Sequence, residues 1–315
     1  MPGAHPGHGS FRMMRPVNRK GTQDAPLASK TVDEDAGEKE MQKNGKEGWA
    51  VITGATSGIG LEFTRQMAGQ GYRLLLVARR GARLYHMKKQ LEVHGVKAQV
   101  LMADLAADYG REMLIRWMEQ HRVDVFINNA GFGLAGSFLE TDAGTERQMI
   151  ELNVTAMHLL MKAALKTMHA RGEGYILNVA SSAGLLPGGP YMATYYATKA
   201  YVASLTQAVA EELRLAGSRI YVGCLCPGPV DTEFNQVADV KFALKGITPR
   251  KCVKAALSGM KRRKVVIVPT LKMRGAVIGG RLLPRKTAVK LTAKQQVKKT
   301  GIEQSEEECS GYTEE

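Results

Sequence analysis

A glycine-rich turn directly after a short apolar stretch is the feature that most restricts the fold of this chain. Residues 49–53 are mostly apolar, and the turn TGATSGIG at residues 53–60 leads into a stretch with helical spacing. Glycines allow a tight turn and close approach of a pyrophosphate, while the helix that begins here directs its unpaired N–H groups at that anion. Ordinary turn glycines are the alternative, but the flanking strand and helix favour dinucleotide binding. The predicted contacts are Gly54, Thr56, Ser57, Gly58, Ile59 and Gly60.

Short stretches rich in Val, Ile and Leu alternate with longer helical stretches from Trp49 onward. The strand-like stretches are 49–53, 72–78, 96–103, 123–128, 175–180, 220–224 and 265–268, and the helical ones include 60–68, 84–93, 109–121, 145–171 and 198–216. Strands that are apolar throughout indicate a parallel sheet with both faces covered by helices. We therefore predict an α/β fold, a Rossmann-type doubly wound parallel sheet of about seven strands in a single domain.

Composition divides the chain into three parts. Residues 1–46 are rich in Gly, Pro and charged residues without an apolar run, so we expect a disordered N-terminal extension. Residues 47–270 hold the alternating pattern and are predicted to form the cofactor-binding and catalytic domain, and 271–315 a basic C-terminal tail with an acidic end.

The irregular stretch from Pro227 to about Arg250 is the best candidate for a substrate lid. No apolar run is long enough to span a membrane, so any membrane contact is expected to be peripheral.

The excess of positive over negative charge in the chain comes from one segment. The net charge is +14, and the segment 241–300 holds 18 Lys and Arg and no Asp or Glu. Such a segment attracts an acyl-CoA phosphate, an acidic partner protein or an anionic membrane surface. A solvated basic helix that only aids solubility is the alternative. Nucleic acid is not an expected partner, because the segment lacks a recognised motif and interleaved aromatic residues.

The four cysteines do not suggest a metal site or a disulfide framework. Cys224, Cys226, Cys252 and Cys309 lack zinc-site spacing and the density of a secreted scaffold. We therefore predict no metal and a reducing, cytoplasmic environment. Cys224 and Cys226 share one face of a strand and are expected to pack in the core.

Two arginines stand where NAD-binding proteins of this type carry an acidic residue, about 20 positions after the glycine turn. Arg79 and Arg80 end the second strand-like stretch, and no Asp or Glu occurs between Glu62 and Glu92. Their guanidinium groups suit the 2′-phosphate of NADP(H), which is the predicted cofactor. The alternative is that both arginines are solvated at a helix entrance.

Tyr195 and Lys199 are the candidate reaction centre. Their spacing puts the hydroxyl and the ammonium on one helix face. The ammonium is expected to lower the pKa of the phenol, which can then exchange a proton with a carbonyl oxygen while a hydride reaches the carbon. Spacing alone is weak evidence, because Tyr85 and Lys89 repeat it on an expected surface helix.

Over residues 47–268 the sequence resembles the short-chain dehydrogenase/reductase family. The family's motifs occur in order, as the glycine turn, Asp104, Asn128-Asn129-Ala130-Gly131, Asn153, Ser181-Ser182, Tyr195 with Lys199, and Pro227-Gly228-Pro229-Val230-Asp231-Thr232. The resemblance implies that Ser182, thirteen residues before Tyr195, orients the substrate oxygen, with Ser181 as a neighbour without that role. It implies that Lys199 also holds the nicotinamide ribose and that Asn153 anchors a proton-relaying water. Further implied cofactor contacts are Asp104, Leu105, Asn129, Ala130, Gly131, Pro227, Gly228, Val230 and Thr232.

The expected activity is that of an NADP(H)-dependent oxidoreductase acting on the carbonyl or secondary alcohol of a lipophilic substrate, such as a 3-oxoacyl chain, a steroid-like ring or another ketone. The alternative is a non-catalytic NADP(H)-binding or scaffolding module of the same fold. The tail is similar to tails of lipid-linked ketoreductases, and the resemblance implies a homo-oligomer, a dimer or a tetramer, formed through the helices at 145–171 and 198–216. The expected pocket wall is apolar, formed by Phe132, Leu134, Leu185, Leu186, Tyr191, Met192 and Phe234.

Overall fold

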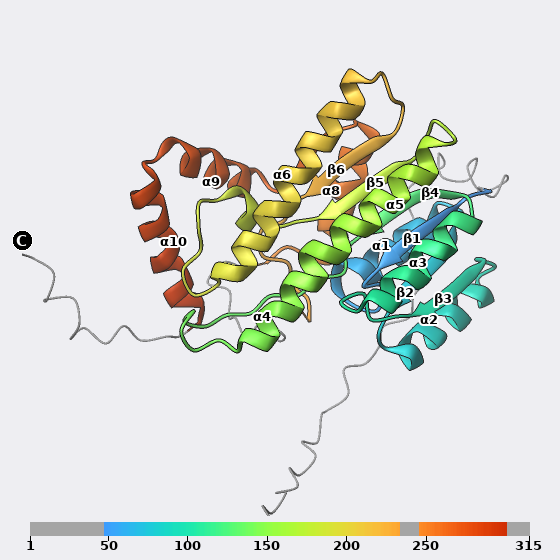
Figure 1. Ribbon diagram of the computed structural model, residues 1–315, viewed down its shortest axis with the longest axis horizontal. Helices are drawn as coiled ribbons and strands as arrows, with labels where there is room; N and C mark the ends of the chain where they lie inside the picture. The colour runs from blue at the N-terminus through green and yellow to red at the C-terminus, as the bar shows by residue number, and fades with distance from the viewer. Residues whose placement is uncertain (1–46, 234–245, 301–315) are drawn as a thin grey trace, which may run out of the picture.

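A seven-stranded parallel sheet forms the centre of the molecule (Figure 1). The computed structural model describes residues 47–233 and 246–300, with side chains as far as residue 297. The strands lie in the order β3-β2-β1-β4-β5-β6-β7. Their bounds are β1 (Trp49–Thr53), β2 (Arg73–Ala78), β3 (Ala98–Met102), β4 (Val123–Asn128), β5 (Tyr175–Val179), β6 (Tyr221–Leu225) and β7 (Val266–Ile267). The predicted fold class is confirmed.

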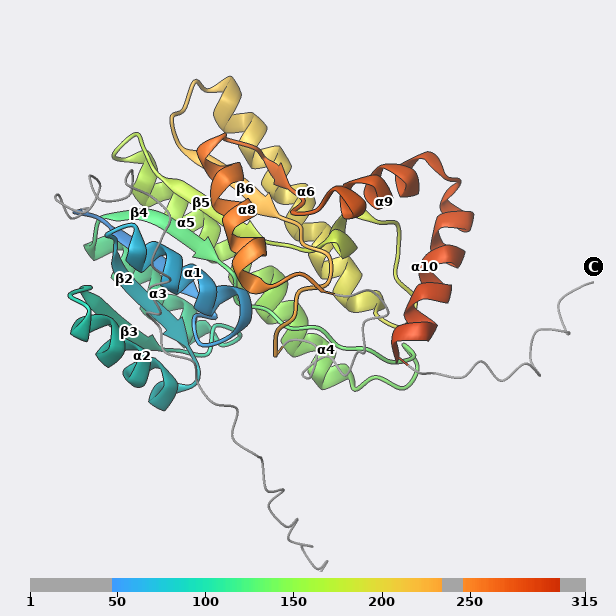
Figure 2. The same cartoon turned by 180° about the vertical axis from the view of Figure 1, so that it is seen from behind.

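Helices cover both faces of the sheet, as Figures 1 and 2 show from opposite sides. One face carries α3 (Asp108–Gln120), α5 (Met157–His169) and α6 (Ala193–Leu215), and the other carries α1 (Gly58–Gly69), α2 (Gly81–Val93) and α8 (Pro249–Lys261). Val51 and Ile52, neighbours on β1, are both fully buried but belong to opposite layers. Successive strand residues point to opposite faces, so strands covered on both sides need no polar positions.

The cysteine of β6 and the one directly after this strand pack in the core, as predicted. Cys224 and Cys226 are buried free thiols with their Sγ atoms 3.7 Å apart. Cys252 is also buried and free, within α8. Cys309 lies outside the described residues.

The helix predicted over residues 145–171 consists of three segments. Asp142 caps α4 (Ala143–Ile150) by accepting a hydrogen bond from the Thr145 N–H at 2.7 Å. A π-helical segment, η1 (Glu151–Ala156), follows and leads into α5. Such segments widen a helix locally and are frequent at functional sites. Asn153 lies in this segment.

The strand order reverses at β1. The chain passes from β1 outward to β2 and β3, then returns to the other side of β1 to form β4 and the remaining strands. The loops after β1 and β4 therefore leave the sheet in opposite directions and open a crevice at the carboxyl ends of these strands. The glycine turn follows β1, and Asn129 follows β4, so both lie at this crevice.

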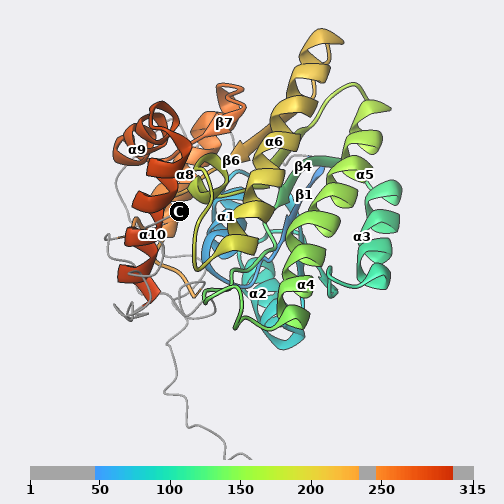
Figure 3. The same ribbon diagram turned by 60° about the vertical axis from the view of Figure 1, so that its left-hand side comes forward.

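Two helices at the carboxyl end of the described chain, α9 (Leu271–Leu282) and α10 (Arg285–Thr300), fold back beside the first part of α6 (Figure 3). Thr270 caps α9 by accepting a hydrogen bond from the Met273 N–H at 3.3 Å. Ala288, Thr292 and Gln296 of α10 are buried and stand four residues apart, so they share one helix face. The segment predicted as a basic tail is therefore packed against the domain as far as it is described, while residues 1–46 and 301–315 lie outside the described part.

Candidate active site

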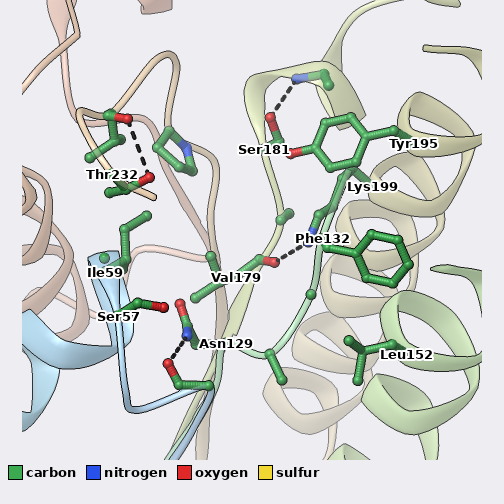
Figure 4. A pocket seen from close by; sticks show the side chains of 18 of the residues that line it. Ser57, Ile59, Asn129, Phe132, Leu152, Val179, Ser181, Tyr195, Lys199 and Thr232 are labelled. Carbon is green, nitrogen blue, oxygen red and sulfur yellow. Dashed lines mark hydrogen bonds between the residues drawn. The ribbon is translucent and has the colours of Figure 1, made fainter. Parts of the chain in front are cut away.

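A cavity of about 460 Å³ lies at the crevice and extends from the glycine turn to α10 (Figure 4). It is lined by most of the residues predicted to bind the cofactor: Gly54, Thr56, Ser57, Gly58, Ile59, Arg79, Arg80, Asp104, Leu105, Asn129, Ala130, Gly131, Tyr195, Lys199, Pro227, Gly228, Val230 and Thr232. Gly60 does not line the cavity. It lets the turn close, because a Cβ at Gly60 would lie 2.2 Å from the Gly54 carbonyl oxygen.

The glycine turn has the geometry that its sequence predicts. Gly54 and Gly58 have φ angles of 65° and 53°, in the left-handed region that glycine adopts readily. Asn129 braces the turn, since its Nδ2 donates a hydrogen bond to the Thr53 carbonyl oxygen at 2.9 Å. The backbone N–H groups of Asn129 and Ala130 donate to Thr53 Oγ1 at 2.8 and 2.9 Å. The turn is therefore held open next to the first turn of α1, and these residues fit a dinucleotide pyrophosphate.

A cluster of arginines lies at the far end of the cavity from Tyr195. Arg80 donates hydrogen bonds to Thr56 Oγ1 at 3.0 and 3.2 Å and forms an ion pair with Glu233 at 3.0 Å. Arg83 also pairs with Glu233, at 2.9 Å, and the exposed Arg79 lines the cavity. Burial raises the pKa of Glu233, but hydrogen bonds from both arginines outweigh it and the net pKa is lowered. No carboxylate lies near these arginines in the sequence, as predicted, but the fold places the carboxylate of Glu233, from a distant segment, beside Arg80 and Arg83.

The remaining predicted cofactor contacts enclose the crevice from two sides. Leu105 is buried, and the exposed Asp104 accepts a hydrogen bond from the Ala106 N–H at 3.0 Å. On the other side, the loop after β6 lies against the glycine turn, since a Cβ at Gly58 would meet Thr232 at 3.1 Å. Gly228 of the same loop is covered by Met273 of α9.

Tyr195 begins the buried face of α6, and its hydroxyl lies beside the Ser181 side chain (Figure 4). Burial raises the pKa of Tyr195 to about 12, and the hydrogen bond with Ser181 opposes that rise. The fold therefore keeps this hydroxyl protonated at neutral pH.

The serine predicted from spacing is not the one at the tyrosine. Ser181 has extended backbone angles and caps the short 3-10 helix η2 (Ser182–Leu185), so its side chain lies between the Ala183 N–H, at 3.1 Å, and Tyr195. Ser182 is the first residue of η2, lines the cavity and donates its N–H to the Pro227 carbonyl oxygen at 2.8 Å. Counting thirteen residues back from Tyr195 leads to Ser182, whereas the serine beside the Tyr195 hydroxyl is its neighbour Ser181, because the backbone turns between them.

Lys199 lies one helical turn after Tyr195, as expected, and is buried. Its Nζ donates a hydrogen bond to the Val179 carbonyl oxygen at 2.9 Å and lies 5.9 Å from the centre of the Tyr195 ring. Burial lowers the pKa of Lys199 to about 8, with Cys226 opposing that effect. The expected lowering of the Tyr195 pKa by Lys199 is not found, because burial raises that pKa and the opposing hydrogen bond comes from Ser181.

Asn153 connects the π-helical segment to both sides of the site. Its Oδ1 accepts a hydrogen bond from the Phe132 N–H at 3.1 Å, and its Nδ2 donates to the Phe132 carbonyl oxygen at 2.8 Å and to Thr198 Oγ1 at 3.2 Å. Thr198 in turn donates to the Tyr195 carbonyl oxygen at 2.8 Å. The side chain therefore positions the loop after β4 and the start of α6. The predicted role as an anchor for water stays a prediction.

The substrate side of the cavity is mostly apolar. Phe132, Leu186 and Met192 line it as predicted, whereas Leu134, Leu185 and Tyr191 do not, and Phe234 lies outside the described residues. Tyr196 also lines the cavity, and sequence reasoning missed several further residues of this wall: Leu152, Met273, Ala276, Gln295 and Gln296. Four of them come from α9 and α10, which no local motif connects to the site.

Comparison with known proteins agrees with this arrangement. The family model described as short chain dehydrogenase matches residues 48–241. The chain is 33% identical over 224 residues to a very-long-chain 3-oxoacyl-CoA reductase of Podospora anserina, covering 69% of this chain and 64% of that protein. It is 36% identical over 187 residues to a galactitol 2-dehydrogenase (L-tagatose-forming) of Cereibacter sphaeroides, covering 59% of this chain and 72% of that protein. The chain thus spans somewhat under two thirds of the length of the fungal reductase.

Solved structures show the same fold. A short-chain dehydrogenase from Sphingobium yanoikuyae in complex with NADPH has a TM-score of 0.68 and 33% identity, covering 74% of this chain and 93% of that one. A bulky-bulky ketone specific alcohol dehydrogenase from Comamonas testosteroni has a TM-score of 0.65 and 29% identity, covering 74% and 92%. Together with the match of the family model over most of the chain, these likenesses show that the protein belongs to the short chain dehydrogenase family.

Proposed function

We propose that this protein is an NADP(H)-dependent oxidoreductase that transfers a hydride between the nicotinamide and the carbonyl or secondary alcohol carbon of a lipophilic substrate. The observation that carries the proposal is that the Tyr195 hydroxyl and the Ser181 side chain lie side by side inside a cavity shared with Lys199 and the glycine turn. The bound cofactor supplies or accepts the hydride. Ser181 holds the substrate oxygen, and Tyr195 exchanges the proton on it.

The protonation state of Tyr195 favours reduction. Its pKa of about 12 leaves the hydroxyl protonated at neutral pH, ready to donate to a carbonyl oxygen. Oxidation of an alcohol requires the phenolate, which the buried site disfavours. At neutral pH the Tyr195 hydroxyl is therefore in the form that ketone reduction requires.

Lys199 and Asn153 complete the proposed site. An ammonium has three N–H donors, of which Lys199 uses one on the Val179 carbonyl oxygen, so the others are available to the hydroxyls of the nicotinamide ribose. With a pKa of about 8, Lys199 is mostly charged at pH 7. Asn153 acts through Phe132 and Thr198 and is a positioning residue. Ser182 has no catalytic part in this proposal.

We assign NADP(H) as the cofactor because three arginines of the protein lie near the glycine turn. Arg79, Arg80 and Arg83 supply three positive groups around the site of the adenosine ribose, and guanidinium groups bind phosphate through paired donors. Glu233 occupies Arg80 and Arg83 in this structure, and a 2′-phosphate would compete with it for them. The similar structure from Sphingobium yanoikuyae contains NADPH, which supports the assignment.

The substrate is proposed to be a lipophilic ketone, with a 3-oxoacyl chain as the first candidate and a steroid-like ring as the second. Phe132, Leu186, Met192, Met273 and Ala276 form an apolar wall beside Tyr195. An apolar wall with few polar groups suits such molecules. The 3-oxoacyl-CoA reductase among the relatives supports the acyl chain.

Turnover of NADPH tests the proposal. Absorbance of NADPH is followed with 3-oxoacyl thioesters, steroid ketones and small aldehydes, using the wild type and Tyr195→Phe. We expect reduction of one lipophilic class by the wild type and a loss of roughly a thousandfold or more in the variant. Fluorescence titration should give unchanged NADPH binding by the variant. A wild type that binds NADPH but reduces nothing would favour the alternative, a non-catalytic NADP(H)-binding or scaffolding module.

Two broader features belong to the same proposal. Leu159 of α5 and Tyr201 of α6 are exposed on neighbouring helices (Figure 1), which supports a homo-oligomer formed through these helices. Light scattering after size-exclusion chromatography measures its mass. The proposed reducing compartment, such as the cytoplasm, is supported by the small number of cysteines and by their lack of the density of a secreted disulfide scaffold. Within the described residues, no helix is both long and apolar enough to cross a membrane.

A further inference from the structure

Helix α9 is apolar on two opposite faces, although only one of them is covered. The face toward the domain carries the half-buried Met273 and the exposed Ala276, both of which line the cavity, and Val277, which is buried. Gly280 lies on the same side, where an added Cβ would meet Leu186 at 3.0 Å. A surface helix packed on a domain ordinarily directs polar side chains away from the core.

The outward face of α9 carries large aliphatic side chains instead. Leu271, Ile278 and Leu282 are 80%, 60% and 82% exposed. They are seven and four residues apart, so at 100° per residue they form one stripe along the helix. Gly275 and Gly279 lie beside the stripe with nothing within 4 Å of an added Cβ. The stripe, defined by Leu271, Ile278 and Leu282, is therefore open to solvent over the length of α9.

Positive side chains flank this stripe on both sides. Lys272 lies on one side and Arg274 and Arg281 on the other, at 100° per residue. Arg274 is held in place by donating a hydrogen bond to the Val268 carbonyl oxygen at 2.9 Å. Arg285 and Lys286 follow at the start of α10, and all five are exposed. Residues 246–300 contain no Asp or Glu, so no negative charge from this segment opposes an anionic surface.

We infer that the outward face of α9 docks on an anionic lipid bilayer. An exposed aliphatic stripe with Lys and Arg along its edges is the pattern of a helix that lies in the plane of a membrane interface, with its apolar face among the acyl chains and its cations at the headgroups. A second copy of this chain fits less well, because a symmetric pair would bring Arg274 and Arg281 close to their own copies. The inference does not depend on the proposed activity.

This docking has a geometric consequence. The face of α9 opposite the stripe forms part of the cavity wall through Met273 and Ala276. Figure 3 shows α9 and α10 together on the outside of the molecule. A bilayer bound at the stripe would therefore lie one helix diameter, about 10 Å, from the apolar wall of the cavity.

Vesicle binding by the full chain tests the inference without substrate or cofactor. The protein is centrifuged with vesicles of phosphatidylcholine alone and of phosphatidylcholine with phosphatidylserine, at low and high salt. We expect binding to the anionic vesicles only, reduced by salt. Failure of the wild type to bind anionic vesicles at low salt would overturn the inference.

Two pairs of variants locate the contact. Ile278→Glu with Leu282→Glu should weaken binding on the order of a hundredfold, whereas Leu139→Glu with Leu215→Glu, at exposed leucines elsewhere, should leave it unchanged. Lys272→Gln with Arg281→Gln should weaken it at least tenfold, on the order expected for two cations, and Lys89→Gln with Lys97→Gln should not. If a test variant and its control weakened vesicle binding equally, in either pair, the inference would be overturned. So would sedimentation velocity that shows Ile278→Glu with Leu282→Glu converting an oligomer to a smaller species, because the stripe would then join copies of the chain.

Discussion

The Nε2 atom of Gln296 lies 2.5 Å from the hydroxyl oxygen of Tyr196, and both side chains are buried. Gln296 is one hundred positions later in the chain, and Tyr196 is the direct neighbour of Tyr195. The hydrogen bond therefore ties α10 to the start of α6, next to the proposed reaction centre. The Tyr196 ring also packs closely on Gly189, where an added Cβ would lie 2.4 Å from the ring.

Replacing Gln296 by Leu should loosen the substrate side of the cavity. The Tyr196 hydroxyl would lose its donor while buried, so the free energy of unfolding should fall by about 1–3 kcal/mol. We expect KM for the best lipophilic ketone to rise about tenfold with a smaller change in kcat, because the contact positions the wall and not the reacting atoms. Denaturant unfolding and steady-state kinetics measure the two effects.

A double-mutant cycle provides the control for this prediction. Tyr196→Phe removes the stranded hydroxyl, so adding it to Gln296→Leu should recover part of the lost stability. Strictly additive losses would mean that the two side chains are not coupled.

Ser181→Ala and Ser182→Ala should have very different effects on catalysis. Ser181 shares the hydrogen bond with Tyr195, so its loss should lower kcat by roughly a hundredfold or more with NADPH binding retained. Ser182 donates its N–H to Pro227 and is not assigned to the substrate oxygen in this proposal, so kcat should change only a few-fold. Single-turnover NADPH oxidation by both variants measures this ranking, and the reverse ranking would restore the assignment made from spacing.

Lys199→Met should stabilise the fold at neutral pH while abolishing activity. Burial lowers the pKa of Lys199 from 10.5 to about 8, so the folded protein binds fewer protons than the unfolded chain between these values, and stability rises with pH in that interval. Below pH 8 the wild type bears the full cost of a buried ammonium, about 3 kcal/mol. The difference in unfolding free energy between variant and wild type should shrink as pH rises from 8 to 10.5. A gap that is constant with pH would show that the ammonium is not destabilised.

The arginine cluster should control the choice between NADPH and NADH. Arg79→Ala with Arg80→Ala should weaken NADPH binding by roughly ten- to a hundredfold and NADH binding much less, because only NADPH carries the 2′-phosphate. Glu233→Gln should strengthen NADPH binding, since it removes the carboxylate that now pairs with Arg80 and Arg83. Fluorescence titration with both cofactors measures these changes. Equal losses for NADPH and NADH would place the arginines outside the phosphate site.

Much of the fold could be predicted because its signals are local. The apolar stretches at residues 49–53 and 123–128 became β1 and β4 with the same bounds, and the glycine turn lies between strand and helix as its sequence requires. Each of these features depends on neighbouring residues, so the order of residue types was sufficient. The single long helix predicted over 145–171 was wrong in detail, because the π-helical segment around Asn153 depends on contacts with Phe132 and Thr198.

The site was predicted less completely, because its details depend on contacts between distant segments. Ser181 and Ser182 are adjacent and chemically identical, and only the turn into η2 decides which of them reaches Tyr195. Glu233 reaches Arg80 across 153 positions.

The sequence by itself determined the parallel sheet, the phosphate-binding turn and the helix that carries Tyr195 and Lys199. Strand, turn and helix patterns depend on residues that are close together in the sequence. Only the tertiary structure decided which serine meets Tyr195, which carboxylate meets the arginines and which helices close the cavity. Gln296 meets Tyr196 across one hundred positions that include β6, α8 and β7, so no local pattern could specify that contact.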